Sequence, residues 1–319
     1  MILDIFKTVP PETDPVLYAI PFFLGAIATE LYINYKEQRN LYSDSKEAYS
    51  SIGMGLGSLV INIVMKGLAY GVYTLVHDNF AIFKSLAPAN MAEFLTLHWH
   101  VTHWWVWVLL LLADDFTFYW HHRLSHEVRV LWAAHVNHHS SQSYNLATAL
   151  RQSWAEQLYK YFWWLWMPLL GFDPLMMLMM MSFSLIYQYW PHTETIRRLP
   201  RWYEFIFNTP SHHRVHHASN TRYLDRNHGG ILIIWDRLLG TFAEERDSEK
   251  PVYGITSNIQ TYNLFKIAGH EFGALWKDIK RAPTFGTKVK YIFMPPGWSH
   301  DGPDQRAKTL RRKLAESEA

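Results

Sequence analysis

The chain of 319 residues is 49% hydrophobic and 16% aromatic but only 18% charged, which is a small supply of charge for the surface of a soluble protein of this length. It has no cysteine, so this chain forms no disulfide, thiolate metal site, iron–sulfur cluster or cysteine nucleophile. The net charge of +2 is unevenly distributed, because residues 1–190 carry 10 Lys and Arg against 14 Asp and Glu, whereas residues 191–319 carry 20 against 14. The composition excludes a disordered chain, and it indicates an apolar N-terminal part and a basic, more polar C-terminal part.

Four apolar stretches are long enough to cross a bilayer, which needs about 20 mostly apolar residues per helix. They are residues 16–34, 48–77, 94–113 and 174–193. A shorter apolar run at 161–172 is joined to the fourth stretch by the turn-forming sequence Gly-Phe-Asp-Pro at 171–174, which predicts a membrane hairpin at about 161–190. Residues 1–15 mix charges with prolines and show no signal-peptide pattern. The competing interpretation is a soluble, all-helical protein with buried helices.

The basic residues between these stretches predict their orientation, because cytoplasmic loops carry an excess of Lys and Arg. If the N-terminus lies outside, the outer segments hold only Lys7 and Lys84. Residues 121–160 and 191–319 then both lie on the cytoplasmic side, and they contain most of the 18 histidines. We therefore expect a multi-pass protein of a bacterial inner membrane or the endoplasmic reticulum, with its active site on the cytoplasmic face.

Three boxes of histidines stand out by their spacing. In residues 115–126, Asp115, Tyr119, His122 and His126 recur at intervals of four, three and four, so they share one face of a helix. The second box, at 135–139, and the third, at 213–217, both read His-x-x-His-His. Imidazole is the commonest protein ligand for transition metals, and two histidines one helical turn apart can bind the same ion. The boxes predict a metal site.

The number of histidines indicates more than one ion. With His192, which follows the last apolar stretch, the boxes supply at least nine candidate ligands. Nine imidazoles are too many for one ion but suit two ions with four or five ligands each. Imidazole-rich ligation without thiolate is compatible with iron, zinc, copper or nickel.

The boxes and the segments around them resemble the fatty acid hydroxylase superfamily, or sterol desaturase family, of membrane-embedded non-haem di-iron oxygenases. The resemblance runs from about residue 114 to residue 244. It rests on three motifs: Asp-Phe-x-x-Tyr-Trp-x-His-Arg-x-x-His at 115–126, Leu-Trp-Ala-Ala-His-Val-Asn-His-His-Ser at 131–140 and Asn-Thr-Pro-Ser-His-His-Arg-Val-His-His at 208–217. The continuation at 225–242 is most similar to the alkylglycerol monooxygenase branch. Outside this span the resemblance is weaker.

The apolar stretches and the resemblance together imply an all-α fold: an integral membrane helical bundle with a cytoplasmic, histidine-rich cap that holds two metal ions. The expected parts are N-terminal transmembrane helices at 1–113, a di-iron domain at 114–245 and a cytoplasmic C-terminal segment at 246–319. By resemblance, the iron ligands are His122, His126, His135, His138, His139, His192, His213, His216 and His217, with His212 and His228 as further candidates. The chain departs from some relatives at Gln188, where they have histidine, and at His228, where they have tyrosine.

Iron also fits the chemistry that the resemblance implies. Inserting oxygen into an unactivated C–H bond, or removing two hydrogens from an alkyl chain, requires a redox-active metal, and zinc has no accessible redox change. The expected activity is O2-dependent hydroxylation or monooxygenation of a lipid alkyl chain or a sterol. A metal-bound histidine usually donates its other N–H to a carboxylate or carbonyl, and Asp115, Glu194 and Asp236 are candidate acceptors, with the amide of Gln188 as a fourth neighbour of the metals.

The expected partners are a lipid or sterol, the membrane and a source of electrons. The chain has no Gly-x-Gly-x-x-Gly nucleotide-binding motif, so electrons must come from outside, from a tetrahydropterin or from a cytochrome- or ferredoxin-type protein. No segment resembles a nucleic-acid-binding module.

Three other functions fit parts of the pattern. A lipid or sterol desaturase would use the same two irons. A histidine-rich metal-ion transporter would place ionisable ligands at mid-membrane depth, where this chain has only Lys66 well inside a stretch. A membrane cytochrome would need paired histidines inside the bilayer. His98, His100 and His103 lie among tryptophans on the predicted outer side and are interpreted as part of an interfacial belt.

Overall fold

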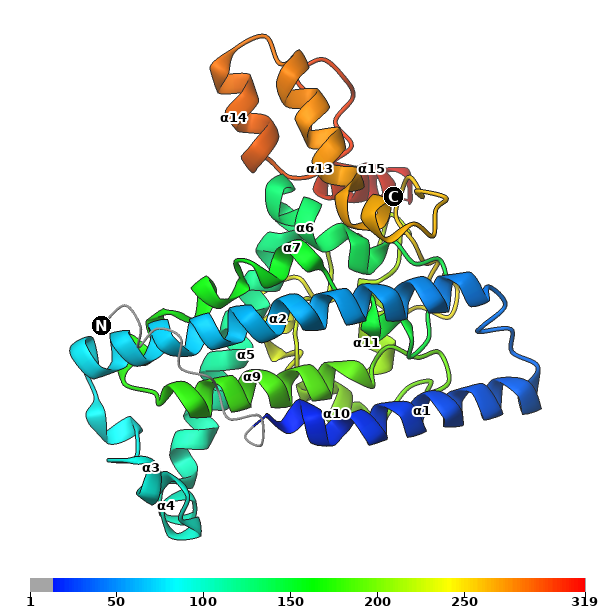
Figure 1. Ribbon diagram of the computed structural model, residues 1–319. Helices are drawn as coiled ribbons and strands as arrows, with labels where there is room; N and C mark the ends of the chain where they lie inside the picture. Colours follow the sequence, from blue (N-terminus) through cyan, green and yellow to red (C-terminus); the bar gives the residue numbers. More distant parts are fainter. Residues whose placement is uncertain (1–13, 319) are drawn as a thin grey trace.

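The computed structural model describes residues 14–318, which form helices joined by loops, with isolated β-bridges and no strand in that range (Figure 1). The all-α prediction is therefore confirmed. Residues 1–13, which include Lys7 and most of the segment without a signal-peptide pattern, and residue 319 lie outside the described residues.

Two helices, α1 (Pro15–Glu37) and α2 (Ser45–Phe80), are long and apolar enough to cross a membrane and match the predicted stretches 16–34 and 48–77. Each begins at an aspartate, Asp14 or Asp44, whose carboxylate accepts hydrogen bonds from the first backbone N–H groups. Only 11% and 17% of their most apolar 18-residue windows are buried. Their apolar side chains therefore face outward, which suits lipid contact better than the core of a soluble protein.

The stretch 94–113 is not one helix, so the prediction of a single span there is wrong. It is divided among α3 (Met91–Phe94), α4 (Leu97–Thr102) and α5 (Trp104–Glu127), after the short η3 (Lys84–Leu86). The run is interrupted after Phe94, where the Thr96 hydroxyl caps the start of α4, and again at His103, between α4 and α5. α5 continues beyond the apolar stretch to Glu127 and therefore carries the whole first histidine box.

In the region of the predicted hairpin, η5 (Lys160–Trp164) and α8 (Trp166–Leu170) are followed by a turn at Gly171 and by α9 (Pro174–Tyr189); η4 (Thr148–Leu150) and α7 (Trp154–Gln157) precede them. The predicted stretch 174–193 is a helix for only 16 residues and is not a candidate span among the described helices. Gly171 has φ 118°, and a Cβ there would collide with the carbonyl oxygen of Phe83, so only glycine fits. α9 packs between α1, α2 and α5 and ends before Pro191, which cannot continue the hydrogen-bonded helix. His192 therefore lies on a loop just beyond the helix.

The remaining helices form the polar part of the molecule: α6 (Arg129–His139), α10 (Arg201–Ile206), α11 (Pro210–His216), α12 (Ile234–Leu239), α13 (Leu264–Arg281), α14 (Phe285–Phe293) and α15 (Ala307–Glu318). α6 packs against both α5 and α13. Figure 1 shows α1, α2 and α9 extending in a common direction, while α13 and α14 form a pair that stands off beyond α6 and runs across that direction. The histidine boxes meet where the end of α5, α6 and α11 come together.

Candidate metal centre

Five buried histidines from three helices form a first group, the five-histidine group. His122 and His126 lie one turn apart on α5, His135 and His139 lie one turn apart on α6, and His216 comes from α11. Each offers a ring nitrogen, and these nitrogens all lie within 4.8 Å of one another. The spacing of four residues thus puts both α5 histidines and both α6 histidines on the same centre, as the sequence predicted for α5.

Four more histidines form the four-histidine group. His138 comes from α6, His192 from the loop after α9, and His213 and His217 from α11 and its C-terminal cap. Their ligand nitrogens also lie within 4.8 Å of one another.

The two groups adjoin, because both His-x-x-His-His boxes contribute to each of them. From the second box, His135 and His139 belong to the five-histidine group and His138 to the four-histidine group. From the third box, His216 belongs to the five-histidine group and His213 and His217 to the four-histidine group. The rings of His139 and His217, one from each group, stack with centroids 4.4 Å apart. The structure therefore brings all nine histidines proposed as ligands by resemblance into one buried, two-part cluster.

Hydrogen bonds orient many of these rings through Nδ1. The acceptors are backbone carbonyl oxygens for four histidines and a carboxylate for the fifth: His228 O for His122, Arg226 O for His216, Arg151 O for His138, Gln188 O for His192 and Glu156 Oε2 for His135, all at 2.8–3.1 Å. A carbonyl only accepts, so the neutral ring carries its proton on Nδ1 and presents an unprotonated Nε2 to the centre. This is the arrangement that a metal-binding histidine requires.

In the described part of the chain, three Nε2 atoms have no hydrogen-bond partner, and the others meet only the Nε2 atoms of neighbouring histidines at 2.9–3.3 Å. Those of His122, His126 and His216 are buried and have no hydrogen bond within residues 14–318. In the four-histidine group, Nε2 of His138 and Nε2 of His192 lie 3.3 Å apart. Both rings hold their proton on Nδ1, so two lone pairs face each other and no hydrogen bond joins them. A bound cation between them would turn this repulsion into ligation, so the residues fit two metal ions.

Burial keeps the rings neutral. Desolvation lowers the pKa well below the ordinary histidine value for His122, His126, His138, His139, His213, His216 and His217, and the neighbouring imidazoles lower it further. A neutral imidazole is the form that binds a metal ion.

Two carboxylates next to the cluster were missed by the sequence analysis. Glu156 on α7 accepts from Nδ1 of His135, and Asp225 has an oxygen 3.5 Å from Nδ1 of His126. In the sequence, Glu156 is the last residue of Ser-Trp-Ala-Glu, the pattern of a capping box, and the Ser153 hydroxyl does accept from the Glu156 N–H. A glutamate at this position is already explained by the start of α7, so the sequence pattern alone does not indicate that its side chain contacts His135.

Asp115 and Asp236 were proposed as acceptors for ligand histidines, but their carboxylates accept hydrogen bonds mainly from backbone N–H groups. Asp115 accepts from the N–H groups of Ile231 and Leu232 and from the indole of Trp235. Asp236 accepts from the N–H groups of His228 and Gly229 and from the Thr241 hydroxyl. Both aspartates thus fix the loop whose His228 carbonyl orients His122. Their effect on the metal site is indirect.

Glu194 and Gln188 also differ from their expected roles. The Glu194 carboxylate accepts from the Tyr253 hydroxyl at 2.9 Å and contacts no histidine ring in the described part of the chain. The amide of Gln188 donates to Ser184, while its backbone carbonyl is the acceptor for His192. Gln188 therefore contributes to the site through its main chain.

The two further candidate ligands lie in different surroundings. The His228 ring is buried beside the five-histidine group, with its centroid 5.1 Å from that of His126, and neither of its nitrogens has a hydrogen-bond partner within the described range. His212 turns away from both groups, with Nδ1 3.3 Å from the Thr209 hydroxyl and its ring edge against Phe242. The geometry favours His228 over His212 as a neighbour of the metals.

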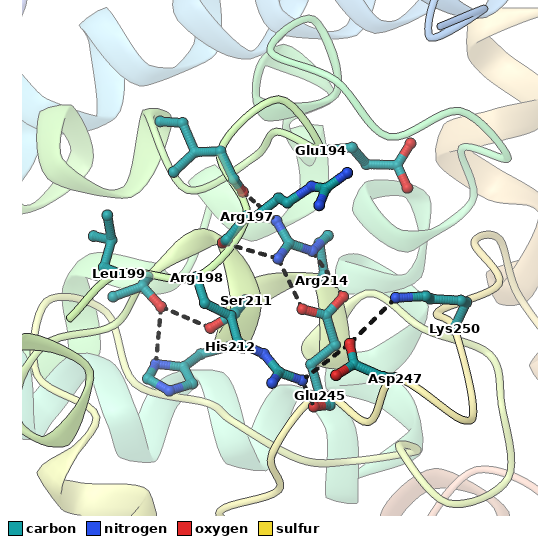
Figure 2. Close-up of polar contacts among 12 residues, drawn as sticks. Glu194, Arg197, Arg198, Leu199, Ser211, His212, Arg214, Glu245, Asp247 and Lys250 are labelled. Atoms are coloured by element: carbon teal, nitrogen blue, oxygen red, sulfur yellow. Dashed lines mark hydrogen bonds and ion pairs between the residues drawn. The ribbon is translucent and has the colours of Figure 1, made fainter. Parts of the chain in front are cut away.

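Arg214 fastens the two segments that supply the four-histidine group (Figure 2). Its buried guanidinium binds both oxygens of Glu245 at 2.8–2.9 Å and donates to the carbonyl oxygens of Thr193 and Ile196. Arg214 follows His213 directly on α11, and the residues that supply these carbonyls follow His192 closely. The donations to Thr193 and Ile196 therefore fix the loop of His192 relative to α11, while the bidentate pair with Glu245 holds the guanidinium in place.

Comparisons with known proteins agree with this site. Residues 107–241, which include all nine clustered histidines, match the family described as Fatty acid hydroxylase. The chain is 37% identical to human alkylglycerol monooxygenase and 36% identical to that of Danio rerio, in each case over 299 residues that make up 93% of this chain and 63% of the relative. It is 30% identical over 162 residues to the ornithine lipid hydroxylase OlsE of Rhizobium tropici, covering 50% of this chain and 49% of that one. No solved structure is significantly similar to the chain.

The predicted resemblance is confirmed, and the chain spans 63% of the length of the vertebrate relatives that it matches. Residues 107–241 thus match a fatty acid hydroxylase domain, and most of the chain is similar in sequence to the alkylglycerol monooxygenases.

Proposed function

We propose that this chain is a membrane-bound, oxygen-dependent lipid monooxygenase whose two histidine groups hold two iron ions. The observation that carries the proposal is the pair of adjoining histidine groups, whose ring nitrogens converge in each group to within 4.8 Å of one another. In the five-histidine group three buried Nε2 atoms have no partner within residues 14–318, and in the four-histidine group the unprotonated Nε2 atoms of His138 and His192 face each other. His122, His126, His135, His139 and His216 would hold one iron, and His138, His192, His213 and His217 the other. The bound irons would supply the electrons needed to activate O2 for attack on an unactivated C–H bond.

The protein's own residues preorganise this site. Backbone carbonyls and Glu156 hold the imidazoles in one tautomer and one orientation, so little reorganisation accompanies metal binding. All nine rings are buried, which excludes bulk water from the ligands and from the oxidising centre. The helices α5, α6 and α11 supply rigid supports for seven of the nine, and an eighth, His217, is the C-cap of α11.

The membrane arrangement follows from α1, α2 and the distribution of charge. We propose that the chain is multi-pass, in a bacterial inner membrane or the endoplasmic reticulum, with the histidine cluster facing the cytoplasm. The clustered histidines lie outside the two candidate spans α1 and α2. A metal-ion transporter would place such ligands within its spans, so this position favours an enzyme.

The substrate class follows from the relatives. These are named for alkylglycerols and for an ornithine lipid, so we propose a lipid with a long alkyl chain as the substrate. Each is named a monooxygenase or hydroxylase, which favours oxygen insertion over desaturation. The electron donor is external, a tetrahydropterin or a cytochrome- or ferredoxin-type protein.

Oxygen-isotope labelling tests the proposal. The purified chain in lipid nanodiscs receives iron(II), an alkylglycerol or an ornithine lipid, 18O2, and either a tetrahydropterin or reduced ferredoxin. We expect a lipid product that contains one 18O atom in one of these arms and no product from the His138→Ala variant. A product that lacks two hydrogens and carries no 18O would identify a desaturase. Absence of any lipid oxidation in a fully metallated sample would contradict the proposed function.

A further inference from the structure

Helices α13 and α14 expose large aromatic side chains although neither is a candidate membrane span. Phe265 and Trp276 on α13 are 78% and 58% exposed, and Phe285 and Phe293 on α14 are 81% and 61% exposed. Phe265 and Trp276 are eleven residues apart, which is close to three helical turns, so they lie on one face. The opposite side of the pair is packed, through Leu275, Ala282 and Tyr291. The exposed aromatics are therefore a surface of this pair and are not part of its core.

The charges of the pair are sorted by face. Its acids, Glu271 and Asp278, both turn inward and pair with Arg129 of α6, at 3.0 and 2.7 Å. Its bases have no acidic partner within the pair and remain exposed: Lys266, Lys277, Lys280, Arg281, Lys288 and Lys290. The outer surface of α13 and α14 thus combines aromatic side chains with uncompensated positive charge.

This surface is continuous with the proposed membrane-spanning part. The Phe265 ring meets that of Trp154 edge to face, and the Trp154 indole donates to a backbone carbonyl of α2. Leu264, at the start of α13, packs against Gly53 of α2. In Figure 1 the pair runs across the direction of α1 and α2, which is the orientation of helices that lie parallel to a bilayer crossed by α1 and α2.

We propose that α13 and α14 lie in the headgroup layer of an anionic bilayer, with their aromatic side chains inserted and their lysines at the lipid phosphates. Aromatic and basic residues on one exposed face are the composition of a helix that binds a membrane surface. α13 packs along α6, which carries histidines of both groups, so this contact would hold the metal centre against the membrane. The inference rests on the proposed membrane placement of α1 and α2.

Site-directed spin labelling tests both placements separately. The chain contains no cysteine, so each introduced cysteine is the only labelling site. The full-length protein is labelled as Trp276→Cys or Phe285→Cys and reconstituted in bilayers with and without anionic phosphatidylglycerol. Ile63→Cys, on the exposed side of α2, reports the membrane span, and Lys308→Cys, on α15, is the control for a water-exposed helix. The measurement is the collision rate of each label with oxygen, which concentrates in lipid, and with a water-soluble nickel complex.

We expect the labels at 276 and 285 to collide more with oxygen than with nickel in anionic bilayers, and the label at 308 to show the reverse. Adding Lys288→Glu and Lys290→Glu to Phe285→Cys should shift its label toward water. If only the label at 63 lies in lipid, α13 and α14 do not bind the membrane and the inference fails while the span stands. If the label at 63 also lies in water, the membrane placement itself fails. Spin–spin broadening at 276 that disappears on dilution with unlabelled chain would show that a second copy covers this surface, and would also overturn the inference.

Discussion

Glu156 offers a direct test of how the protein holds one of its metal ions. The Glu156→Gln variant keeps the shape of the side chain and an oxygen that can accept from Nδ1 of His135, but it removes the negative charge that lies 3.0 Å from that ring. A charged acceptor makes the metal-binding nitrogen of the ring more basic and strengthens ligation.

We expect a loss of affinity for only one of the two metal ions, because Glu156 contacts a ligand of the five-histidine group and none of the four-histidine group. Removing a partner of this kind lowers metal affinity by about 10- to 100-fold. The amide of the Glu156→Gln variant retains a hydrogen bond to the ring, so we expect a loss near tenfold, which corresponds to about 1.4 kcal/mol.

Anaerobic titration of the metal-free protein with iron(II) against a chelator measures the two affinities. The matched control is Glu194→Gln, which neutralises another partly buried glutamate whose side chain contacts Tyr253 and no histidine ring in the described range. Thermal unfolding of both variants shows whether either is destabilised. Two unchanged iron affinities in Glu156→Gln, or an equal loss in Glu194→Gln, would refute this reasoning.

Other measurements address the site, the fold and the topology. His138→Ala should abolish lipid oxidation and lower metal content, whereas His98→Ala should leave both unchanged; equal metal loss in the two variants would show that the site is misplaced. Burial lowers the pKa of His122, His139 and His216, so the metal-free protein should be most stable above pH about 6.5 and lose about 1.4 kcal/mol per pH unit below it for each of these rings that stays neutral; equal unfolding temperatures at pH 7.5 and 5.5 would contradict this. Gly171→Ala should destabilise the protein by on the order of 2 kcal/mol, because alanine is strained at φ 118°, and an unchanged unfolding temperature would argue against this turn. A C-terminal reporter should be active only on the cytoplasmic side; activity only outside would reverse the proposed orientation.

The sequence predicted much of the cluster because helical spacing determines which side chains share a face. His122 and His126 meet on one centre for that reason alone. The division of each His-x-x-His-His box between two centres was not predicted, because it depends on how α6 and α11 are placed relative to α5 and to each other, which brings His216 to His122 and His217 to His139. The nine histidines themselves were assigned by resemblance, and the structure shows them together.

The acceptors of the ligand histidines could not be predicted from spacing. Four are backbone carbonyls, such as those of Arg151 and Gln188, and any residue type supplies a carbonyl. Asp115 shares a helix face with His122, which suggested a contact, but its carboxylate is taken up by the backbone of residues 231–232. The membrane prediction over 94–113 failed because mean hydropathy does not register the local breaks at Thr96, which caps α4, and at His103, where α5 begins.

The central claim is that each of the two histidine groups binds its own metal ion. Metal content per chain, measured for the purified wild-type protein and for His216→Ala and His138→Ala, tests this most directly. We predict two ions in the wild type and about one in each variant, with the same remaining affinity as in the wild type for the untouched group. One ion per wild-type chain, or simultaneous loss of both ions in a folded His216→Ala variant, would contradict two separate sites.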